Sequence, residues 1–497
     1  MAGYEASLDA LLAQLDPSAW PDAPKGFVHV KEPRPMRAVL TGPLDGPRGH
    51  APVIVKWNRA DTLADHVSRA VRGGKAVREG TVLRALKTAG VRVPEPLAYT
   101  DENGADVLVT AFLPDLTPLP AADRVPAPLL EDVAMLLAVA HAAGMRHDDL
   151  HAGNLALSDG LPVLIDLGSA RIGKPIAPSE LVKVLAGLAH GLLAGARRSQ
   201  QLRALIAYLR QVHGGDGREP ARALARKIEA ELRLVRRRFR RGRDRRATRS
   251  GKHFEVFATE SGVSGIRNRD TTDREWIERA EGWLRDPPPD ATALKAAGRV
   301  MQTGEVVVKH YDGVAAGRLP RPLRAFRMAY ALAVRGIAAP TPHLALAEDD
   351  GAGIVATAFI DAPNLHDFIA EGRYEALETA DRRRLLENLG RTLRRMHDAE
   401  VSHRDLKAPN LLIDDDLRPV IVDLDGARVR RGAVRWARRA RDMMRLDASL
   451  ALPERDRTRI LTAYHTVLPR PPMDLGTFAD EVATLSRKKR GPSGEPR

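Results

Sequence analysis

Apolar positions in the first half of the chain follow two alternating patterns. Residues 51–57 and 107–113 are short runs rich in β-branched side chains, which is typical of buried strands. Residues 76–89 and 129–143 repeat their apolar positions with helical spacing. A loop rich in His and Asp follows the second of these helices, and residues 162–166 form a further short strand. The pattern predicts a small β-rich lobe that leads into a helical lobe.

The second half repeats this order of elements. Strands are predicted at residues 304–310 and 354–360, and helices at residues 321–335 and 383–399. Five residues recur 256 positions later, namely His141, His147, Asp149, Leu150 and Asn154, which return as His397, His403, Asp405, Leu406 and Asn410. Asp166 matches Asp423, one residue further on. A repeat of core packing alone would preserve apolar positions first. The repeat of His, Asp and Asn therefore indicates a duplicated site.

An arginine-rich segment separates the halves. Residues 233–249 contain ten arginines, and the preceding residues 219–234 have helical character, so we expect a helix that frays into a basic linker. A solvated helix end and a patch that contacts phosphates or a membrane both fit this segment. The expected division is residues 1–232 for the first domain, 233–250 for the linker, 251–486 for the second domain and 487–497 for a basic, disordered tail.

The composition is that of a soluble globular protein with more than one core. The chain has 497 residues, of which 44% are apolar and 29% are charged. It has no cysteine, which excludes disulfides, thiolate metal sites and cysteine nucleophiles. Neither a signal peptide nor an uncharged apolar stretch of about 20 residues is evident, so we expect a cytoplasmic protein. The net charge of +14 favours anionic partners such as nucleotides, phosphoglycans and acidic lipid surfaces.

The repeated loop carries the most specific motif. Residues 147–154 and 403–410 each hold an Asp followed by an Asn, and a short apolar strand downstream ends at Asp166 or Asp423. These segments resemble the catalytic loop and the metal-binding Asp motif of the protein-kinase-like superfamily. The resemblance implies an α+β fold of two tandem bilobal kinase-like domains, each with a small β-rich N-lobe and a helical C-lobe.

Phosphoryl transfer explains these residue types. The Mg²⁺ ions that accompany ATP prefer oxygen ligands, and a separate Asp must accept or orient the proton of the attacking hydroxyl. The resemblance therefore implies ATP and Mg²⁺ as cofactors. The expected bases are Asp149 and Asp405, and the expected metal ligands are Asn154, Asp166, Asn410 and Asp423. The expected nucleotide contacts are Lys56 and Lys309 at the ends of apolar strands, Glu79 beside Lys56, and the backbone after Phe112 or Phe359.

The halves differ at a position that the superfamily uses to orient its strand lysine. Glu79 is placed to pair with Lys56, whereas the equivalent helix position of the second half is Ala325. No acidic residue lies between Asp312 and Glu348, so this helix offers the second lysine no carboxylate. Neither half shows a clear Gly-x-Gly-x-x-Gly loop before its lysine, so cradling of phosphates by such a loop is not predicted.

The residue two positions after the loop Asp bears on the kinase branch. Lys407 matches the lysine that Ser/Thr protein kinases use near the γ-phosphate, whereas His151 resembles small-molecule kinases. Residues 422–426 and 441–450 make the second half more similar to the bacterial lipopolysaccharide-core kinases, which phosphorylate heptose or Kdo sugars. The resemblance implies transfer of the γ-phosphoryl group to a hydroxyl of such a sugar. The positive charge would then attract an anionic glycan acceptor, with peripheral contact at the inner membrane.

Three alternatives stay open. A Ser/Thr protein kinase is favoured by Lys407. A scaffold in which one domain is a pseudokinase is suggested by Ala325 and by Asp148, which stands where the second half has Arg404. A nucleic-acid-binding protein could use residues 233–249, but the sequence lacks an aromatic stacking pattern or a recognisable nucleic-acid module. Nucleic acid is therefore not an expected partner.

Overall fold

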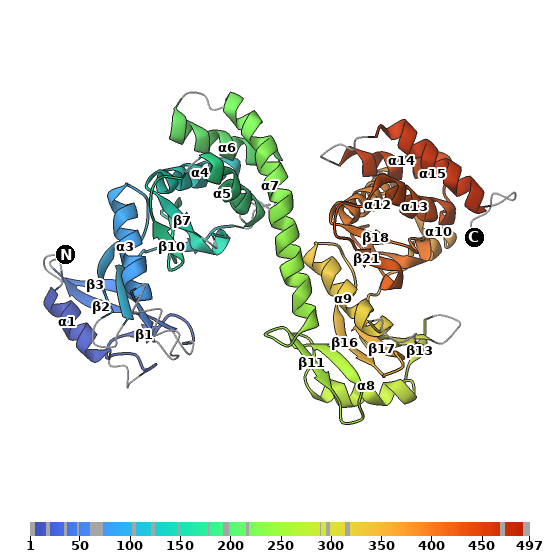
Figure 1. The fold of residues 1–497 in the computed structure, drawn as a ribbon, viewed down its shortest axis with the longest axis horizontal. Helices are drawn as coiled ribbons and strands as arrows, with labels where there is room; N and C mark the ends of the chain where they lie inside the picture. The colour runs from blue at the N-terminus through green and yellow to red at the C-terminus, as the bar shows by residue number, and fades with distance from the viewer. Residues whose placement is uncertain are drawn as a thin grey trace. The chain divides into compact units, whose positions relative to one another are not determined.

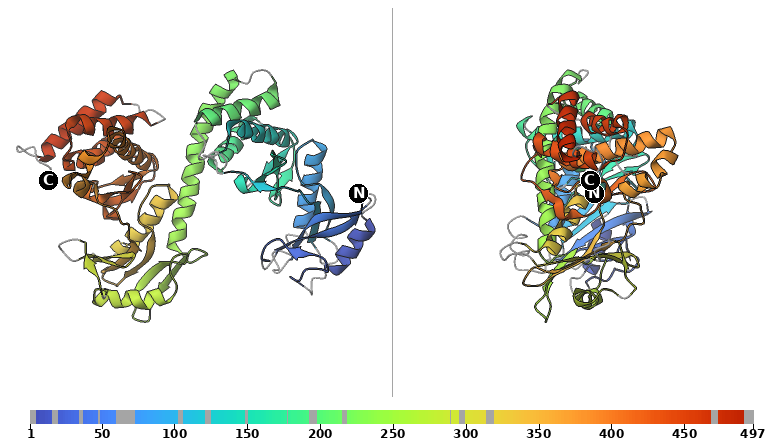
Figure 2. Two further views of the ribbon diagram at one scale, coloured as in Figure 1. Left: turned by 180° about the vertical axis from the view of Figure 1, so that it is seen from behind. Right: turned by 90° about the vertical axis from the view of Figure 1, so that its right-hand side faces the viewer.

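The computed structural model describes residues 5–15, 20–33, 37–46, 49–59, 73–101, 106–120, 125–147, 150–176, 178–191, 198–214, 218–288, 290–294, 299–313, 319–467 and 473–490. The chain divides into two compact units, Met1–Arg237 and Arg238–Arg497. Figure 1 colours the first unit from blue to green and the second from yellow-green to red, and Figure 2 shows the same ribbon from two other sides. Each unit has a sheet-rich lobe and a helical lobe, so the α+β class expected from the sequence is confirmed.

The first unit begins with a five-stranded antiparallel sheet in the order β1-β2-β3-β5-β4. Its strands are β1 (Val28–His29), β2 (Arg37–Gly46), β3 (Gly49–Asn58), β4 (Pro96–Thr100) and β5 (Asp106–Ala111). Inward side chains of β3, Trp57 among them, form a core with α1 (Glu5–Gln14). α3 (Lys75–Thr88) packs on β4 and β5. Asp106 at the start of β5 accepts hydrogen bonds from backbone N–H groups in the first turn of α3. The sheet and α3 together place the strand lysine and the helix glutamate on facing elements.

The helical lobe of the first unit surrounds the motif loop. α4 (Ala127–Ala142) is largely apolar and packs against α6. The elements of this lobe are β6 (Thr117–Pro118), β7 (Met145–His147), the 3₁₀ turn η3 (Ala152–Asn154), β8 (Leu155–Ser158), β9 (Leu161–Leu164), β10 (Ala170–Ile172), α5 (Pro178–Gly191), α6 (Arg198–His213) and α7 (Arg218–Asp244). β7 pairs with β10, and β8 pairs with β9, so two short antiparallel ribbons flank the loop and fix its ends.

The second unit has a larger sheet of seven antiparallel strands in the order β11-β12-β16-β17-β15-β14-β13. The strands are β11 (Phe254–Ala258), β12 (Ser264–Asn268), β13 (Thr292–Ala293), β14 (Val300–Thr303), β15 (Val306–Tyr311), β16 (Pro342–Ala347) and β17 (Gly353–Ala358). α9 (Arg321–Val334) packs on β16 and β17, and α8 (Glu275–Arg285) contacts the same two strands. The β11–β12 hairpin extends the sheet beyond the strands that the sequence predicted.

The helical lobe of the second unit repeats the pair of ribbons around the motif loop. Its elements are α10 (Leu365–Ala370), α11 (Arg373–Ala376), α12 (Thr379–Asp398), β18 (Val401–His403), η5 (Ala408–Asn410), β19 (Leu411–Ile413), β20 (Pro419–Ile421), η6 (Leu424–Gly426), β21 (Ala427–Val429), α13 (Trp436–Ser449), α14 (Glu454–Thr466) and α15 (Leu475–Arg490). Because α15 extends to Arg490, residues 487–490 of the expected disordered tail are helical. Residues 491–497 lie outside the described part of the chain. Within that described part, none of the helices combines the length and apolar character needed to cross a bilayer.

α7 continues through the segment that was expected to be a linker. Its helical residues extend to Asp244 and the 3₁₀ turn η4 (Arg245–Thr248) follows at once, so most of residues 233–250 is helical. Asp244 accepts hydrogen bonds of 2.7 and 2.8 Å from the guanidinium of Arg335, whose side chain is 1% exposed. Residues 238–244 of α7 belong to the second unit, and this bidentate pair holds the end of the helix within that unit.

Two of the repeated histidines belong to the packing of the helical lobes. His141 near the end of α4 and His397 near the end of α12 are buried, and their Nδ1 atoms lie 2.9 and 2.7 Å from the hydroxyl oxygens of Tyr208 and Tyr464. Burial lowers the pKa of His141 to about 4, and it also lowers the pKa of His397. The internal repeat therefore includes a duplicated His–Tyr packing contact as well as the duplicated motif loop.

His141 should make stability depend on pH. Because its pKa is lower in the folded chain than in the unfolded chain, it contributes stability above about pH 6.5 that is lost as the pH falls toward 4, roughly 3 kcal/mol in all. Denaturant unfolding of H141Q should show a smaller loss of stability between pH 7 and pH 4.5 than the wild-type protein shows. H213Q changes an exposed histidine of α6 and should keep the wild-type loss. An equal loss in H141Q and wild type would contradict this role.

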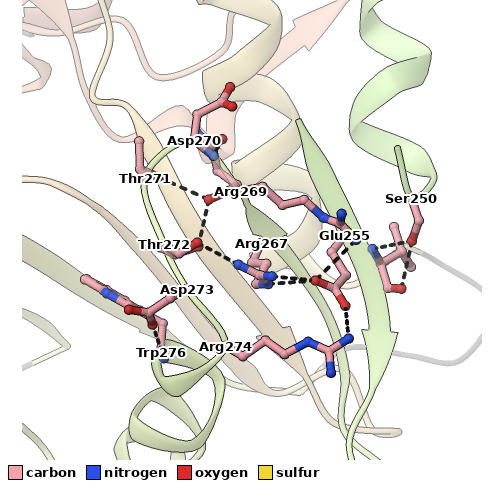
Figure 3. Close-up of polar contacts among 12 residues, drawn as sticks. Ser250, Glu255, Arg267, Arg269, Asp270, Thr271, Thr272, Asp273, Arg274 and Trp276 are labelled. Atoms are coloured by element: carbon pink, nitrogen blue, oxygen red, sulfur yellow. Dashed lines mark hydrogen bonds and ion pairs between the residues drawn. The ribbon is translucent and has the colours of Figure 1, made fainter. Parts of the chain in front are cut away.

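Glu255 on β11 joins the β11–β12 hairpin through arginines (Figure 3). Arg267 on β12 donates hydrogen bonds of 2.9 and 2.6 Å to Glu255 Oε2, and Arg274 Nη2 lies 3.3 Å from Oε1. Arg267 also donates to the carbonyl oxygen of Thr272 at 2.6 Å. Burial alone would raise the pKa of Glu255, but the hydrogen bonds and charges of Arg267, with those of Arg269 and Arg274, lower it below its ordinary value. The pair stabilises a hairpin that forms one edge of the sheet.

E255Q should destabilise the second unit because it leaves the guanidinium of Arg267 buried without its carboxylate. We expect a loss of about 3 kcal/mol at pH 7, measured by denaturant unfolding. Since the folded-state pKa of Glu255 is depressed, its contribution is present above the unfolded pKa of about 4.3 and disappears as the pH falls through the folded value. The difference between wild type and E255Q should therefore shrink below pH 4. A difference that stays constant down to pH 3 would show that the charge of Glu255 is not what stabilises the hairpin.

Candidate active site

The candidate site of the second unit lies where its sheet meets the motif loop. β15 carries Lys309, the loop after β18 carries Asp405, and Asp423 follows β20. Asp423 has a φ of 55°, in the left-handed region, and Asp166 of the first unit has a φ of 54°. Asp adopts this conformation more readily than most other residues, and such outliers cluster at functional sites. In both units a strained turn holds the expected metal ligand in place.

Lys309 is held by two carboxylates. Its Nζ lies 2.6 Å from Asp423 Oδ1 and 2.9 Å from Asp425 Oδ2. The hydroxyl of Tyr311 donates to Asp425 Oδ1 at 2.9 Å, and Arg321 Nη2 lies 3.3 Å from Asp425 Oδ2. Burial alone would lower the pKa of Lys309, but the two carboxylates raise it above its ordinary value. Lys309 therefore keeps its positive charge inside the cleft.

The motif loop of the second unit brings three polar side chains together. Lys407 Nζ lies 3.0 Å from Asp405 Oδ2. Asn410 Nδ2 donates to the backbone oxygen of Asp405 at 2.8 Å and to its Oδ2 at 3.2 Å. Asn410 is only 1% exposed, and its Oδ1 finds no hydrogen-bond partner among the described residues. A buried carbonyl oxygen in this state costs free energy unless a ligand supplies the partner.

Two cavities share Lys309, Tyr311 and Asp423 as lining residues. The larger, of about 380 Å³, is lined mainly by apolar side chains of β14, β15, β17 and β19 and by Phe359 with the chain that follows it. The other, of about 330 Å³, is polar and also contains the side chain of Asp405. An apolar slot beside a cluster of charges is the arrangement expected for a nucleotide whose base is flat and whose phosphates are charged.

The first unit holds its strand lysine differently. Lys56 on β3 forms an ion pair with Glu79 on α3, and its Nζ lies 3.5 Å from Asp166 Oδ1. Arg37 on β2 reaches the same carboxylate, with Nη2 at 3.0 Å from Asp166 Oδ1. Burial alone would raise the pKa of Asp166, but Lys56 and Arg37 lower it. Asp166 is therefore ionised and faces two protein cations. At the end of β5, Phe112 is 42% exposed.

Both polar atoms of the motif Asn in the first unit form hydrogen bonds within the protein. Asn154 Nδ2 donates to the backbone oxygen of Asp166 at 3.1 Å, and Asn154 Oδ1 accepts a hydrogen bond of 3.0 Å from the backbone N–H of His151. Asn410 differs because its Oδ1 is left without such a donor. Residues 148–149, which include the expected base Asp149, lie outside the described part of the chain.

The side chains of the second unit fit a hard divalent cation. Asn410 offers an unpartnered amide oxygen and Asp423 a carboxylate, which are ligands that Mg²⁺ prefers. In the first unit the matching amide oxygen is already hydrogen-bonded and Asp166 faces Lys56 and Arg37. Across the described residues, no group of three or more His, Asp or Glu side chains forms a metal site by itself. Water and oxygens of a bound nucleotide would complete the coordination of an ion held by Asn410 and Asp423.

Some residues of the site were not predicted from the sequence. In the second unit these are Asp425, Tyr311 and Arg321, and in the first unit Arg37. The sequence did contain a signal for Asp425. The half that lacks a helix carboxylate has a second Asp two positions after Asp423. Arg37 is 129 positions from Asp166 and has no motif around it, so nothing in the sequence pointed to it.

Both units match one protein family. The sequence profile of the lipopolysaccharide kinase (Kdo/WaaP) family matches residues 57–208 and 274–464, about two thirds of the chain. A 3-deoxy-D-manno-octulosonic acid kinase of Xanthomonas campestris pv. campestris (strain B100) is 29% identical over 181 residues, which are 36% of this chain and 70% of the relative. A protein of the same name from Vibrio cholerae serotype O1 is 46% identical over 48 residues, which are 10% of this chain and 20% of the relative.

Two solved structures are similar to parts of the chain. One is WaaP in complex with acyl carrier protein, with 21% identity and a TM-score of 0.32, covering 46% of this chain and 91% of that one. The other is the kinase domain of Mycobacterium tuberculosis PknI, with 18% identity and a TM-score of 0.26, covering 41% of this chain and 96% of that one. The family match is the stronger finding, because its two segments fall in the two units and contain both motif loops.

Proposed function

Because the chain belongs to the lipopolysaccharide kinase (Kdo/WaaP) family, we propose that it transfers the γ-phosphoryl group of ATP to a hydroxyl of a lipopolysaccharide-core sugar. Membership of the family makes the chain a kinase. ATP as the donor and the core sugar as the acceptor are the proposed details. The names of the curated relatives favour a 3-deoxy-D-manno-octulosonic acid residue as that sugar. The net charge of +14 supports an anionic acceptor, with peripheral contact at an acidic membrane surface.

We assign the transfer to the second unit. Asp405 would accept or orient the proton of the attacking hydroxyl, and Lys407, 3.0 Å from it, would lie near the γ-phosphate. Lys309 would contact the α- and β-phosphates. Asn410 and Asp423 would hold Mg²⁺, which neutralises phosphate charge when it is bound with ATP. Most of the rate enhancement would then come from positioning and charge stabilisation, since no covalent intermediate with the protein is needed.

The apolar cavity of the second unit supports a place for adenine. Its walls come from both lobes, with Val307 and Val355 from the sheet and Leu412 from the helical lobe. The chain from Phe359 to Asn364 runs along it, so backbone groups there could hydrogen-bond the base. The charged end of the cavity at Lys309 and Asp423 then receives the phosphates. This orientation directs the γ-phosphate toward Asp405.

One observation carries the choice of unit. Asn410 Oδ1 is buried without a protein donor, whereas Asn154 Oδ1 accepts a hydrogen bond from His151. A buried oxygen without a hydrogen-bond donor lowers the stability of the folded protein unless a ligand interacts with it. We propose that the first unit has little or no transfer activity of its own, although Lys56 and Glu79 could still contact a nucleotide.

A Ser/Thr protein kinase is the second candidate function. The observation in its favour is the contact of Lys407 with Asp405, because Ser/Thr protein kinases carry a lysine at this position of the loop. The same contact is compatible with a sugar hydroxyl as acceptor. The acceptor that becomes labelled separates the two functions.

The test uses the full chain with γ-labelled ATP, Mg²⁺ and a bacterial envelope extract, followed by separation of glycolipid from protein. The wild-type protein should label glycolipid. D405N should lower turnover by about 100-fold or more, because it removes the proton acceptor, while its equilibrium binding of ATP stays close to wild type. D149N, the matched change in the first unit, should keep most of the activity.

Two results would contradict the proposal. Label that appears only in protein would establish the protein-kinase alternative. Turnover that survives D405N but is lost in D149N would move the reaction to the first unit. Retention of ATP binding in D405N is the internal check that the variant is folded.

A further inference from the structure

The second unit must hold its strand lysine without a glutamate from the neighbouring helix. In the first unit, Glu79 of α3 pairs with Lys56 and also accepts a hydrogen bond of 3.1 Å from the backbone N–H of Leu167. α9 has no acidic residue, and the position equivalent to Glu79 is Ala325. Ala325 and Lys309 line the same cavity, so the alanine faces the space that a carboxylate occupies in the first unit.

Asp425 fills this role from the other side of the cleft. Its Oδ2 lies 2.9 Å from Lys309 Nζ. The carboxylate is itself fixed by the hydroxyl of Tyr311 at 2.9 Å and by Arg321 at 3.3 Å. Asp425 is 19% exposed, so the pair is largely shielded from water. The hydroxyl of Tyr311 and the guanidinium of Arg321 fix the position of the Asp425 carboxylate, and this fixed carboxylate in turn orients the ammonium group of Lys309.

The first unit shows the reciprocal arrangement. The residue equivalent to Asp425 is Gly168, two positions after Asp166. A Cβ atom at Gly168 would lie 3.3 Å from Glu79 Oε2, so the carboxylate of Glu79 packs closely against the position from which a side chain here would extend. One unit therefore combines a helix glutamate with a loop glycine, and the other combines a helix alanine with a loop aspartate. In both units the strand lysine pairs with the Asp that follows the motif loop and with one further carboxylate, which comes from the helix in the first unit and from the loop in the second.

We infer that Asp425 is the positioning residue for Lys309 and replaces the helix glutamate in the second unit. This inference rests on the proposed transfer reaction at that unit. Its consequence is structural: the lysine pair of the first unit requires α3 to lie against the sheet, whereas both partners in the second unit come from β15 and the loop after β20. α9 contributes neither partner of the Lys309–Asp425 pair, and it reaches Asp425 only through Arg321 at its first residue.

The rival role for Asp425 is that of a further metal ligand, since it lies two residues after Asp423. The two roles respond differently to a transplanted carboxylate. A glutamate introduced on α9 can restore the ion pair of Lys309 from the helix side, as Glu79 does for Lys56. It would not restore a metal ligand that belongs on the loop. Rescue by A325E therefore separates the roles.

The test compares D425G and the double variant A325E/D425G in the full chain. The double variant rebuilds in the second unit the helix glutamate and loop glycine of the first unit. D425G should lower kcat/KM for ATP by about 10- to 100-fold, and A325E/D425G should recover at least half of the loss on a logarithmic scale. D425N, which keeps the size of the side chain but removes the charge, should behave as D425G does. Thermal unfolding of each variant checks that the second unit is folded.

A second readout does not depend on turnover. An acyl-phosphate derivative of ATP that acylates lysines near the phosphates labels Lys309 and Lys56 in one molecule, and mass spectrometry gives their ratio. The ratio of Lys309 to Lys56 should fall at least fivefold in D425G and return in A325E/D425G.

An unchanged ratio in D425G, or a fall that A325E does not reverse, would overturn the inference. If the wild-type protein labels Lys309 but transfers no phosphate to any acceptor, the proposed function fails while the ratio still decides the role of Asp425.

Discussion

The site of each unit depends on a strand lysine that is largely buried and paired with carboxylates. An ammonium group removed from water is costly unless carboxylates compensate for the lost hydration. Lys56 has Glu79 and Asp166, and Lys309 has Asp423 and Asp425. This requirement links the two lobes of each unit, because the lysine belongs to the sheet and the Asp after the motif loop belongs to the helical lobe. The ion pair therefore assembles the site that the proposed reaction needs.

The two units meet the same requirement with different residues, and the difference is consistent with a division of labour. In the first unit Oδ1 of Asp166 contacts Lys56 and Arg37, and Asn154 Oδ1 accepts a hydrogen bond within its own loop. In the second unit Asn410 keeps a buried oxygen available. Duplication of a domain permits this change, because one copy can lose the capacity to bind a metal while the other retains it. The His–Tyr contact of the helical lobe occurs in both units, and in the second unit His397 also lies 3.3 Å from Asp442 Oδ2, which accepts a hydrogen bond from the backbone N–H of His403.

The strands and helices around the site and the residues of the motif loop could be predicted from the sequence for clear physical reasons. Strands and helices around the site have strong apolar periodicity, so β3, β5, α9 and α12 lie close to the predicted ranges. Residues at fixed spacing within one loop, such as Asp405 and Asn410, are close in space whatever the rest of the fold does. The contact of Arg37 with Asp166 joins distant segments and depends on tertiary packing. Asp425 was overlooked because the family pattern directs attention to the helix. The linker 233–250 was expected to fray because of its charge, yet Asp244 and Arg335 hold its helix in place.

The two units differ most in the proposed metal site, since Asn410 keeps an amide oxygen available for Mg²⁺ and Asn154 does not. Electron paramagnetic resonance of Mn²⁺, titrated into the full chain with a non-hydrolysable ATP analogue, tests this difference most directly. We expect nucleotide-dependent Mn²⁺ binding that falls to background in D423N and is unchanged in D166N. Equal loss in the two variants, or loss in D166N alone, would contradict it.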